Sequence, residues 1–120
     1  MRYLESLNKA LHQLITNDDK VIVLGEDIAD PYGGAFKVTK GLSSSFPKQV
    51  FSTPISEAAI IGLSTGLAMN GYKPIVEIMF GDFIMLGADQ LLNHLLKYEW
   101  MYDDKVKVPV TIRTTMGGRR

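Results

Sequence analysis

Hydrophobic and polar positions along this chain form blocks that predict helices and strands in alternation. Apolar residues recur at three- and four-residue spacing from Leu4 to Ile15 and predict a helix of about four turns with one apolar face. The run Val21–Leu24 is entirely apolar, which is typical of a strand buried on both faces, and Gly25 closes it. A second, short strand is predicted at Val50–Ser52.

The second half of the chain continues this alternation. A helix with almost no charge is predicted over Pro54–Met69, with the proline in its first turn, and Asn70–Gly71 is suited to end it. Lys73–Ile78 and Val108–Ile112 predict two further strands, and Met85–Met101 predicts a helix between them. The expected buried face of that helix comprises Leu91, Leu92, Leu95, Leu96 and Trp100. The pattern therefore predicts an α/β fold, a mostly parallel sheet flanked by helices on both faces.

Length and charge narrow the class of protein. The chain has 120 residues, enough for one domain or part of one, and its 13 basic and 13 acidic residues balance. Such a balance argues against nucleic-acid and membrane-surface partners. The absence of cysteine is compatible with a reducing cytoplasm, and no apolar run has the length of a membrane span. Because the last predicted strand is followed only by Gly117–Arg120, we expect the amino-terminal part of a longer cytoplasmic protein.

Carboxylates mark two places where chemistry is expected. Glu57 is the only charged side chain between Pro54 and Tyr72. It is either an exposed carboxylate that matches the helix dipole or a carboxylate set deliberately in an apolar site. The segment Glu26–Asp30 carries three carboxylates just after the first strand, where open α/β sheets bind ligands, although a solvated loop reads the same way. A short helix is expected near Val38–Leu42.

Two glycine patterns in the predicted helix over 54–69 suggest different functions, and one of them is disfavoured. Gly62–Gly66 matches the Gly-x-Ser-x-Gly spacing of a hydrolase nucleophile elbow, with His94 downstream. That elbow needs a strand directly before the serine, whereas Ser64 falls inside a helix, so a hydrolase triad is disfavoured. The same helix presents a face with almost no side chain, formed by Ala58, Gly62, Gly66 and Asn70. Another backbone is expected to approach it, from the sheet, a second subunit or a ligand.

The segment Met79–Met85 follows the third strand and is either an apolar wall beside a ligand ring or a loop anchored in the core. His12 and His94 stand alone on separate predicted helices, so we expect no metal site. No glycine-rich phosphate loop is present either. The chain by itself therefore shows no means of binding a diphosphate.

Taken together, the motifs resemble those of the beta subunit of the thiamine diphosphate-dependent decarboxylase component of 2-oxoacid dehydrogenase complexes. The resemblance spans residues 1–120, which would form the amino-terminal part of a transketolase-like pyrimidine-binding domain. The segments that carry it are Tyr3–Leu11, Val23–Ala29, Gly33–Leu42, Thr53–Glu57, Pro74–Ile78, Phe80–Phe83, Asp89–Gln90 and Val108–Arg113.

The resemblance implies a cofactor, thiamine diphosphate, and a role for four residues. Glu57 would hydrogen-bond the aminopyrimidine ring nitrogen and exchange a proton with it, because an apolar site brings the neutral and ionised carboxyl forms closer in energy. Phe83 would stack on the pyrimidine, Met79 would line its pocket, and Glu26 would reach the cofactor through a hydrogen-bond network. The cofactor would serve as the electron sink for decarboxylation of a small 2-oxo acid.

The resemblance also implies partners. An alpha subunit would hold the diphosphate and magnesium, a second beta subunit would complete a heterotetramer, and a lipoyl-bearing acyltransferase core would accept the acyl group. The isolated chain is therefore expected to be inactive. Leu86 replaces a polar residue of some pyruvate-type members, which leaves the substrate acid open. Two alternatives are the pyrimidine domain of a transketolase-like or deoxyxylulose-phosphate-synthase-like enzyme, and a non-catalytic assembly module.

Overall fold

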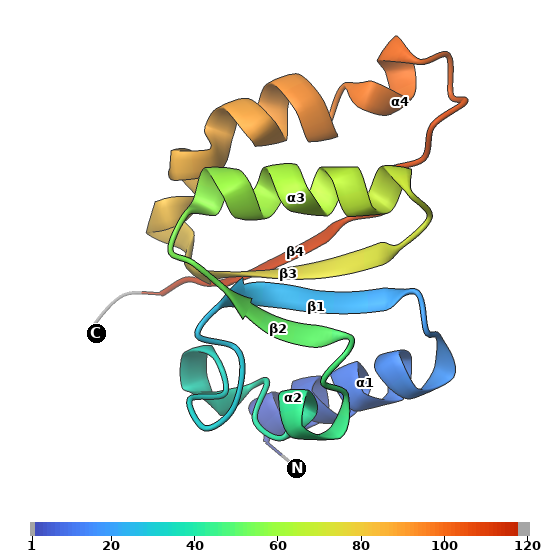
Figure 1. Ribbon diagram of the computed structural model, residues 1–120. Coiled ribbons are helices and arrows are strands. Elements are labelled where there is room, and N and C mark those ends of the chain that lie inside the picture. Colours follow the sequence, from blue (N-terminus) through green and yellow to red (C-terminus); the bar gives the residue numbers. More distant parts are fainter. Residues whose placement is uncertain (1, 118–120) are drawn as a thin grey trace.

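The centre of the molecule is a four-stranded parallel sheet in the order β2-β1-β3-β4 (Figure 1). In the computed structural model, which describes residues 2–117, the strands are β1 (Val21–Glu26), β2 (Val50–Thr53), β3 (Lys73–Phe80) and β4 (Thr111–Thr115). Every residue of β1 is buried, as its apolar run predicts for a central strand covered on both faces. The α/β prediction is confirmed.

Helices cover both faces of the sheet (Figure 1). On one face, α1 (Tyr3–Asn17) and α2 (Leu42–Ser45) pack through Leu11, Ile15 and Leu42 against alternate residues of the strands. On the other face, α3 (Glu57–Met69) buries Ile60 and Ile61 against the sheet. The apolar face predicted for α1 is only partly covered, because Leu4 and Leu14 are 39% and 49% exposed.

The helix α3 starts three residues later than the sequence pattern predicts. Ser56 has an extended backbone and its Oγ accepts a hydrogen bond from the N–H of Ala59 at 3.4 Å, so Ser56 caps the helix and Glu57 is its first residue. Pro54 therefore lies before the helix and not in its first turn, which corrects the prediction. The cap places Glu57 where the helix dipole favours negative charge.

The single helix predicted over 85–101 is wrong. The chain forms 3-10 turns at Gly81–Gly87 (η2), a π-helical segment at Gln90–Leu95 (η3) and a short α4 at Tyr98–Met101. Of its expected buried face, only Leu95 is buried, and Leu91 is half-buried. The other members are exposed, namely Leu92 at 52%, Leu96 at 65% and Trp100 at 80%. The apolar periodicity of residues 85–101 indicated helical structure, but it did not indicate which of the apolar side chains are buried.

Two boundaries shift for reasons of backbone chemistry. The fourth strand begins at Thr111 and not at Val108, because Pro109 has no N–H to give to a ladder. The backbone N–H of Val108 instead donates to Glu99 Oε1 at 3.0 Å. The short helix predicted near 38–42 lies at α2, after Gly41 with a left-handed φ of 82°, and a 3-10 turn, η1, occupies Ala35–Lys37. None of the helices formed by residues 2–117 has the length and apolar character that a membrane crossing requires.

Candidate functional site

Two glutamates meet at the carboxyl edge of the sheet. Glu26 is the last residue of β1 and Glu57 is the first residue of α3, and both are buried, at 5% and 6% exposed. Along β1, alternate residues such as Ile22 and Leu24 face α3, and Glu26 continues that series. The fold thus brings together two carboxyl groups that are 31 positions apart in the sequence. The predicted network from Glu26 to a cofactor remains a prediction.

The two carboxyl groups are electrostatically coupled. Burial raises the pKa of Glu26, and the charge of Glu57, a hydrogen bond to Glu57 and the charge of Asp27 raise it further. The Oε1 atom of Glu26 is buried and has no hydrogen-bond partner among the described residues. A buried polar atom without a partner is uncommon in a folded protein and is typical of a functional site. The pair can hold one shared proton and still offer an acceptor to a ligand.

The turns of η2 lie against the first turn of α3. A Cβ at Gly87 would come within 3.2 Å of the Glu57 carbonyl oxygen and 2.5 Å of Ile61 Cδ1, so the two segments approach closely here. Within η2, Phe83 is 42% exposed, and its ring packs edge-on against Phe80 with 5.8 Å between centroids. An exposed aromatic face therefore lies in the segment that packs on the Glu57 turn.

Met79 lies at a bulge in β3. Ile78 pairs with Thr114 and Phe80 pairs with Thr115, so Met79 is the extra residue between them. Its side chain is half-buried, and its carbonyl oxygen accepts a hydrogen bond from Thr115 Oγ1 at 2.7 Å. Bulges of this kind re-aim a side chain next to active sites. The predicted contacts of Met79 and Phe83 with a pyrimidine ring remain predictions.

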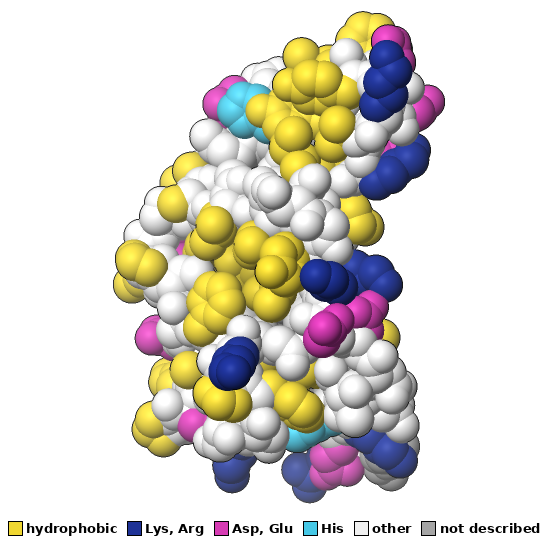
Figure 2. Space-filling model, turned by 45° about the vertical axis from the view of Figure 1, so that its right-hand side comes forward, with side chains coloured by type: hydrophobic (Ala, Val, Ile, Leu, Met, Phe, Trp, Pro, Cys, Tyr) yellow, Lys and Arg dark blue, Asp and Glu magenta, His cyan; other side chains and the backbone are white. Residues whose placement is uncertain are grey.

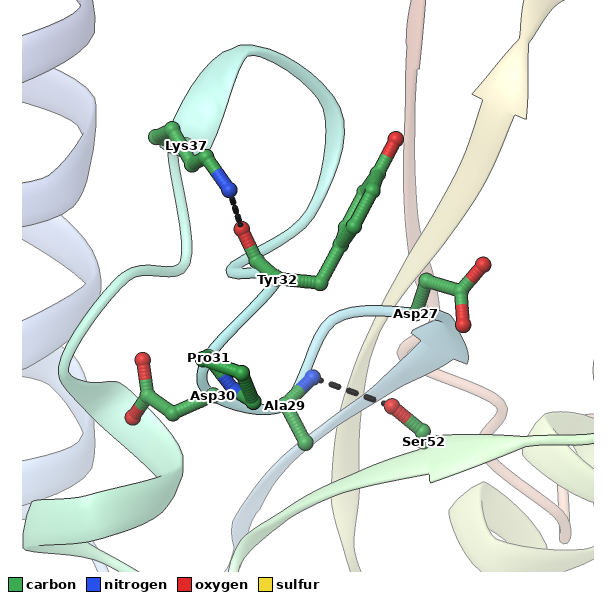
Figure 3. A pocket seen from close by; sticks show the side chains of 7 residues that line it. All are labelled: Asp27, Ala29, Asp30, Pro31, Tyr32, Lys37 and Ser52. Carbon is green, nitrogen blue, oxygen red and sulfur yellow. Dashed lines mark hydrogen bonds between the residues drawn. The ribbon is translucent and has the colours of Figure 1, made fainter.

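A cavity of about 440 Å³ opens beside the carboxylate turn (Figure 3). Its lining residues are Asp27, Ala29, Asp30, Pro31, Tyr32, Lys37 and Ser52. The Lys37 ammonium donates to the Tyr32 carbonyl and lies 4.8 Å from the centroid of the Tyr32 ring. Ser52 Oγ accepts from the N–H of Ala29 at 3.0 Å, which ties the loop to β2. Neither Glu26 nor Glu57 lines this cavity, although Asp27, the residue after Glu26, does.

A second, smaller cavity adjoins the other side of the Glu57 turn. It has a volume of about 170 Å³ and an apolar lining of Thr53, Pro54, Ser56, Ala59, Ile60 and Leu63. Four of the five residues in the segment 53–57 therefore either line this cavity or belong to the carboxylate pair. The segment 53–57, which the sequence pattern singled out, therefore contributes to both this cavity and the carboxylate pair.

Sequence reasoning missed a third buried carboxylate, Glu77. It is 1% exposed in the middle of β3 and pairs with Arg113 of β4. The signal was present, because Glu77 interrupts an otherwise apolar strand, and a charge in a buried strand needs a partner. The partner could not be named, because the pairing of β3 with β4 is a property of the fold.

The remaining candidate residues have structural surroundings. Ser64 is fully buried and its hydroxyl donates to the Ile60 carbonyl at 2.7 Å, inside α3, which fits the rejection of a hydrolase triad. His12 packs edge-on against Phe46, and His94 lies beside Tyr98. Within residues 2–117, no group of three or more His, Asp or Glu side chains is placed to hold a metal ion.

The arrangement defines a class: a parallel α/β domain with a buried carboxylate pair at the carboxyl edge of its sheet. Comparison with protein families gives the particular family. Residues 1–119 match the family described as "Transketolase, pyrimidine binding domain". The chain belongs to this family.

Curated relatives include several beta subunits. The chain is 45% identical over 115 residues to the pyruvate dehydrogenase E1 component subunit beta of Leifsonia xyli subsp. xyli, covering 95% of the chain and 34% of that protein. It is 42% identical to the 3-methyl-2-oxobutanoate dehydrogenase subunit beta of Mycobacterium tuberculosis, covering 91% and 31%. A third relative, the acetoin:2,6-dichlorophenolindophenol oxidoreductase subunit beta of Bacillus subtilis, is 38% identical, with 94% and 36% covered. The resemblance to such beta subunits is confirmed.

A solved structure shares the fold. A chain described as "Split gene transketolase, inactive beta4 tetramer" superposes with a TM-score of 0.65 at 25% identity, covering 90% of this chain and 31% of that one. The present chain spans about a third of the length of the curated relatives it matches. The transketolase-like fold expected from the motifs is therefore confirmed for this part.

Proposed function

We propose that this chain is the pyrimidine-binding part of a 2-oxoacid dehydrogenase beta subunit that acts with thiamine diphosphate. The observation that carries the proposal is the buried pair Glu26–Glu57 with its one unpartnered oxygen, in a chain that is 38–45% identical to three such or related beta subunits. The proposed whole protein decarboxylates a 2-oxo acid in the cytoplasm and passes the acyl group to lipoamide.

The residues present fit an aminopyrimidine ring. A ring with both donor and acceptor nitrogens matches a site that offers a carboxylate, a carboxyl group and the orphaned Oε1 of Glu26. The exposed ring of Phe83 offers a flat apolar face for stacking, and Met79 offers a thioether at the bulge. The chain offers no comparable site for a diphosphate, so the proposal assigns the diphosphate and magnesium to an alpha subunit.

In this proposal Glu57 is the residue that hydrogen-bonds the ring nitrogen. Its place at the start of α3 and its burial hold the carboxyl group still and exclude water. Burial and the neighbouring Glu57 charge raise the pKa of Glu26, which favours its protonated form and would let Glu26 donate a hydrogen bond within the pair. When bound, the cofactor supplies the electron sink for decarboxylation.

The test uses a chimera, because the chain spans only part of its relatives. The matching region of the Leifsonia xyli beta subunit is replaced by this chain and expressed with its alpha subunit. We expect pyruvate decarboxylation to fall at least ~100-fold in Glu57→Ala while the subunits still assemble, since general acid–base groups contribute about 10²–10⁴-fold. Asp19→Ala, at an exposed turn, is the control and should keep activity. Near-normal turnover of the Glu57→Ala chimera would contradict the proposed role of Glu57.

The transketolase-like alternative shares the carboxylate chemistry and differs in substrate, so the same chimera assayed with a ketose phosphate separates the two. The assembly-module alternative predicts that calorimetric titration of the chimera with thiamine diphosphate shows no binding. Binding that is present in the chimera and lost in Glu57→Ala supports the enzyme.

The proposed partners include an alpha subunit and a second beta subunit, and the outer face of α3 supports a protein interface. A Cβ at Gly66 would meet no atom within 4 Å, and one at Gly62 would meet only Gln90 Cγ at 3.7 Å, so no described backbone covers this face. Beside it, Leu63 and Met69 are 50% and 40% exposed. Figure 2 shows hydrophobic side chains gathered at the height of α4 and again lower down, at the height of the sheet. We assign this surface to contact with a second beta subunit.

A further inference from the structure

Glu77 is a buried charge on the opposite face of the sheet from the Glu26–Glu57 pair. It follows Ile75 on the α1 side of β3 and is 1% exposed. In the register of the sheet Glu77 lies opposite Gly25 of β1. A Cβ at Gly25 would come within 2.5 Å of the Glu77 carbonyl oxygen and 3.1 Å of its Cβ. The glycine directly before Glu26 therefore makes room for Glu77.

The Glu77 carboxylate joins two separate parts of the chain. Its Oε1 accepts the backbone N–H of Ala35 at 2.7 Å, and its Oε2 accepts from Arg113 Nη1. The Arg113 side chain is itself only 19% exposed. Gly34 has a left-handed φ of 72°, and a Cβ there would come within 3.0 and 3.1 Å of the two carboxylate oxygens. The loop approaches this carboxylate closely enough to require glycine, so the contact is specific.

The same loop is tied to the residue that follows Glu26. The N–H of Gly34 donates to the Asp27 carbonyl at 2.9 Å, so adjacent residues connect the loop to Glu77 and to Asp27. Asp27 has a φ of 49°, a left-handed conformation that is uncommon for a residue other than glycine. Such a conformation persists when surrounding contacts hold it, and it is frequent at functional sites. The Asp27 backbone sets where the end of β1, and hence Glu26, points.

We propose that Glu77 is a positioning residue: through Ala35 and Gly34 it holds the Asp27 turn, and thereby aims the Glu26 carboxyl group at Glu57. Arg113 neutralises Glu77 so that its charge can stay buried. The purpose of this connection rests on the proposed function, since a cofactor-binding pair needs fixed geometry. The connection itself is a property of this chain and can be measured without cofactor or partner.

The test compares two variants of the 120-residue chain that carry the same charge. Glu77→Gln keeps an acceptor for the Ala35 N–H, whereas Glu77→Ala removes it, so their difference reports positioning and not the loss of a nearby charge. We expect the Ala35 amide to exchange with solvent at least ~10-fold faster in Glu77→Ala than in Glu77→Gln, relative to β3 amides. The NMR-measured pKa of Glu26, which faces Glu57 and Asp27, should fall towards its ordinary value only in Glu77→Ala.

Asp19→Ala, at an exposed turn, is the control and should leave both measurements unchanged. Equal pKa values for Glu26 in Glu77→Ala and Glu77→Gln would overturn the proposal and leave Glu77 a structural residue only. If Glu77→Ala does not fold, amide exchange in the unmodified chain tests the proposal instead. The Ala35 amide must then exchange as slowly as the β3 amides, and exchange at the rate of an exposed loop would overturn the proposal. If the chimera does not bind thiamine diphosphate, the proposed function is contradicted. The exchange rate of the Ala35 amide and the pKa of Glu26 would still test the role of Glu77.

Discussion

At the scale of single residues, the two carboxyl groups of the candidate site lie in different surroundings. Glu57 begins a helix, where the dipole favours a negative charge, whereas Glu26 ends a fully buried strand and has one oxygen without a partner. Burial and the Glu57 charge raise the pKa of Glu26, which favours its protonated form. The two carboxyl groups of the pair are therefore not equivalent.

This asymmetry predicts a pH-dependent gain of stability in Glu26→Gln. A raised pKa in the folded state means that Glu26 contributes stability below its ordinary value of 4.5 and loses it as pH rises through the folded value. Glutamine removes that loss, so we expect the free energy of unfolding to rise by about 1 kcal/mol at pH 7 and by much less at pH 4. Urea titrations at both pH values measure it, and a gain independent of pH contradicts the asymmetry.

At the scale of elements, hydrogen bonds from one segment hold another in its conformation. Asp30 lies in the loop after β1 but caps α2, because its carboxylate accepts from the N–H groups of Gly41 and Ser44 at 2.8 and 3.2 Å. The hydroxyls of Ser43 and Ser44 donate to it at 3.0 and 2.6 Å. Chiefly the Ser44 hydroxyl, and then the Gly41 N–H, hold the pKa of Asp30 far below its usual range.

We therefore expect the stability of the Asp30→Asn variant to fall less steeply at acid pH than that of the unmodified chain. A depressed pKa contributes stability above the ordinary value of 3.8, and this stability is lost as pH falls through the folded value. We expect the variant to be less stable than the unmodified chain at pH 7 and the difference to shrink below about pH 4. Thermal unfolding followed by circular dichroism across this pH range tests the trend. A constant difference would assign the role of Asp30 to packing.

Two glycines give a matched pair of substitutions on α3 and its neighbour. A Cβ at Gly87 would collide with Ile61 and the Glu57 backbone, whereas a Cβ at Gly66 meets open space. We expect Gly87→Ala to lower the free energy of unfolding by about 2 kcal/mol through overpacking. Gly66→Ala should raise it by about 1 kcal/mol through helix propensity. Denaturant unfolding of both variants measures the pair, and effects of the same sign would contradict the close approach of η2 to α3.

The elements differ in how far the sequence could predict them. The strand predicted at 21–24 and the helix predicted from 4 to 15 follow from periodicity alone, although β1 continues through Gly25, which was expected to close it, to Glu26. Glu57 stood out as a lone charge in an apolar segment. The break-up of 81–101 could not be predicted, because the apolar spacing of Leu92, Leu96 and Trp100 implies a cover that the described residues do not provide. The links from Glu26 to Glu57 and from Glu77 to Arg113 depend on sheet order, which a single sequence does not contain.

At the scale of the whole molecule, the described residues leave several surfaces uncovered, and two of them adjoin the sheet edge at β4 and the outer face of α3. The outer edge of β4 pairs with no other strand, and a cavity of about 520 Å³ beside it is lined largely by apolar residues of α1 and by β4. On the other side of the sheet, α3 presents its glycine face. Open sheet edges and apolar faces favour association with further protein. A domain that shares its site with partner subunits is expected to have such surfaces.

The assignment of the α3 face to a second beta subunit predicts separate effects on folding and assembly. Gly66→Leu adds a side chain where the chain has open space and improves helix propensity, so the chain alone should be at least as stable as before. In the chimera with its alpha subunit, the same side chain should block close helix approach and weaken assembly at least ~10-fold, measured by sedimentation velocity. Gln13→Leu, on the exposed side of α1, is the control and should assemble normally. Unchanged assembly of Gly66→Leu would move the interface away from α3, whereas loss of stability in the chain alone would mean that this face is covered within the monomer.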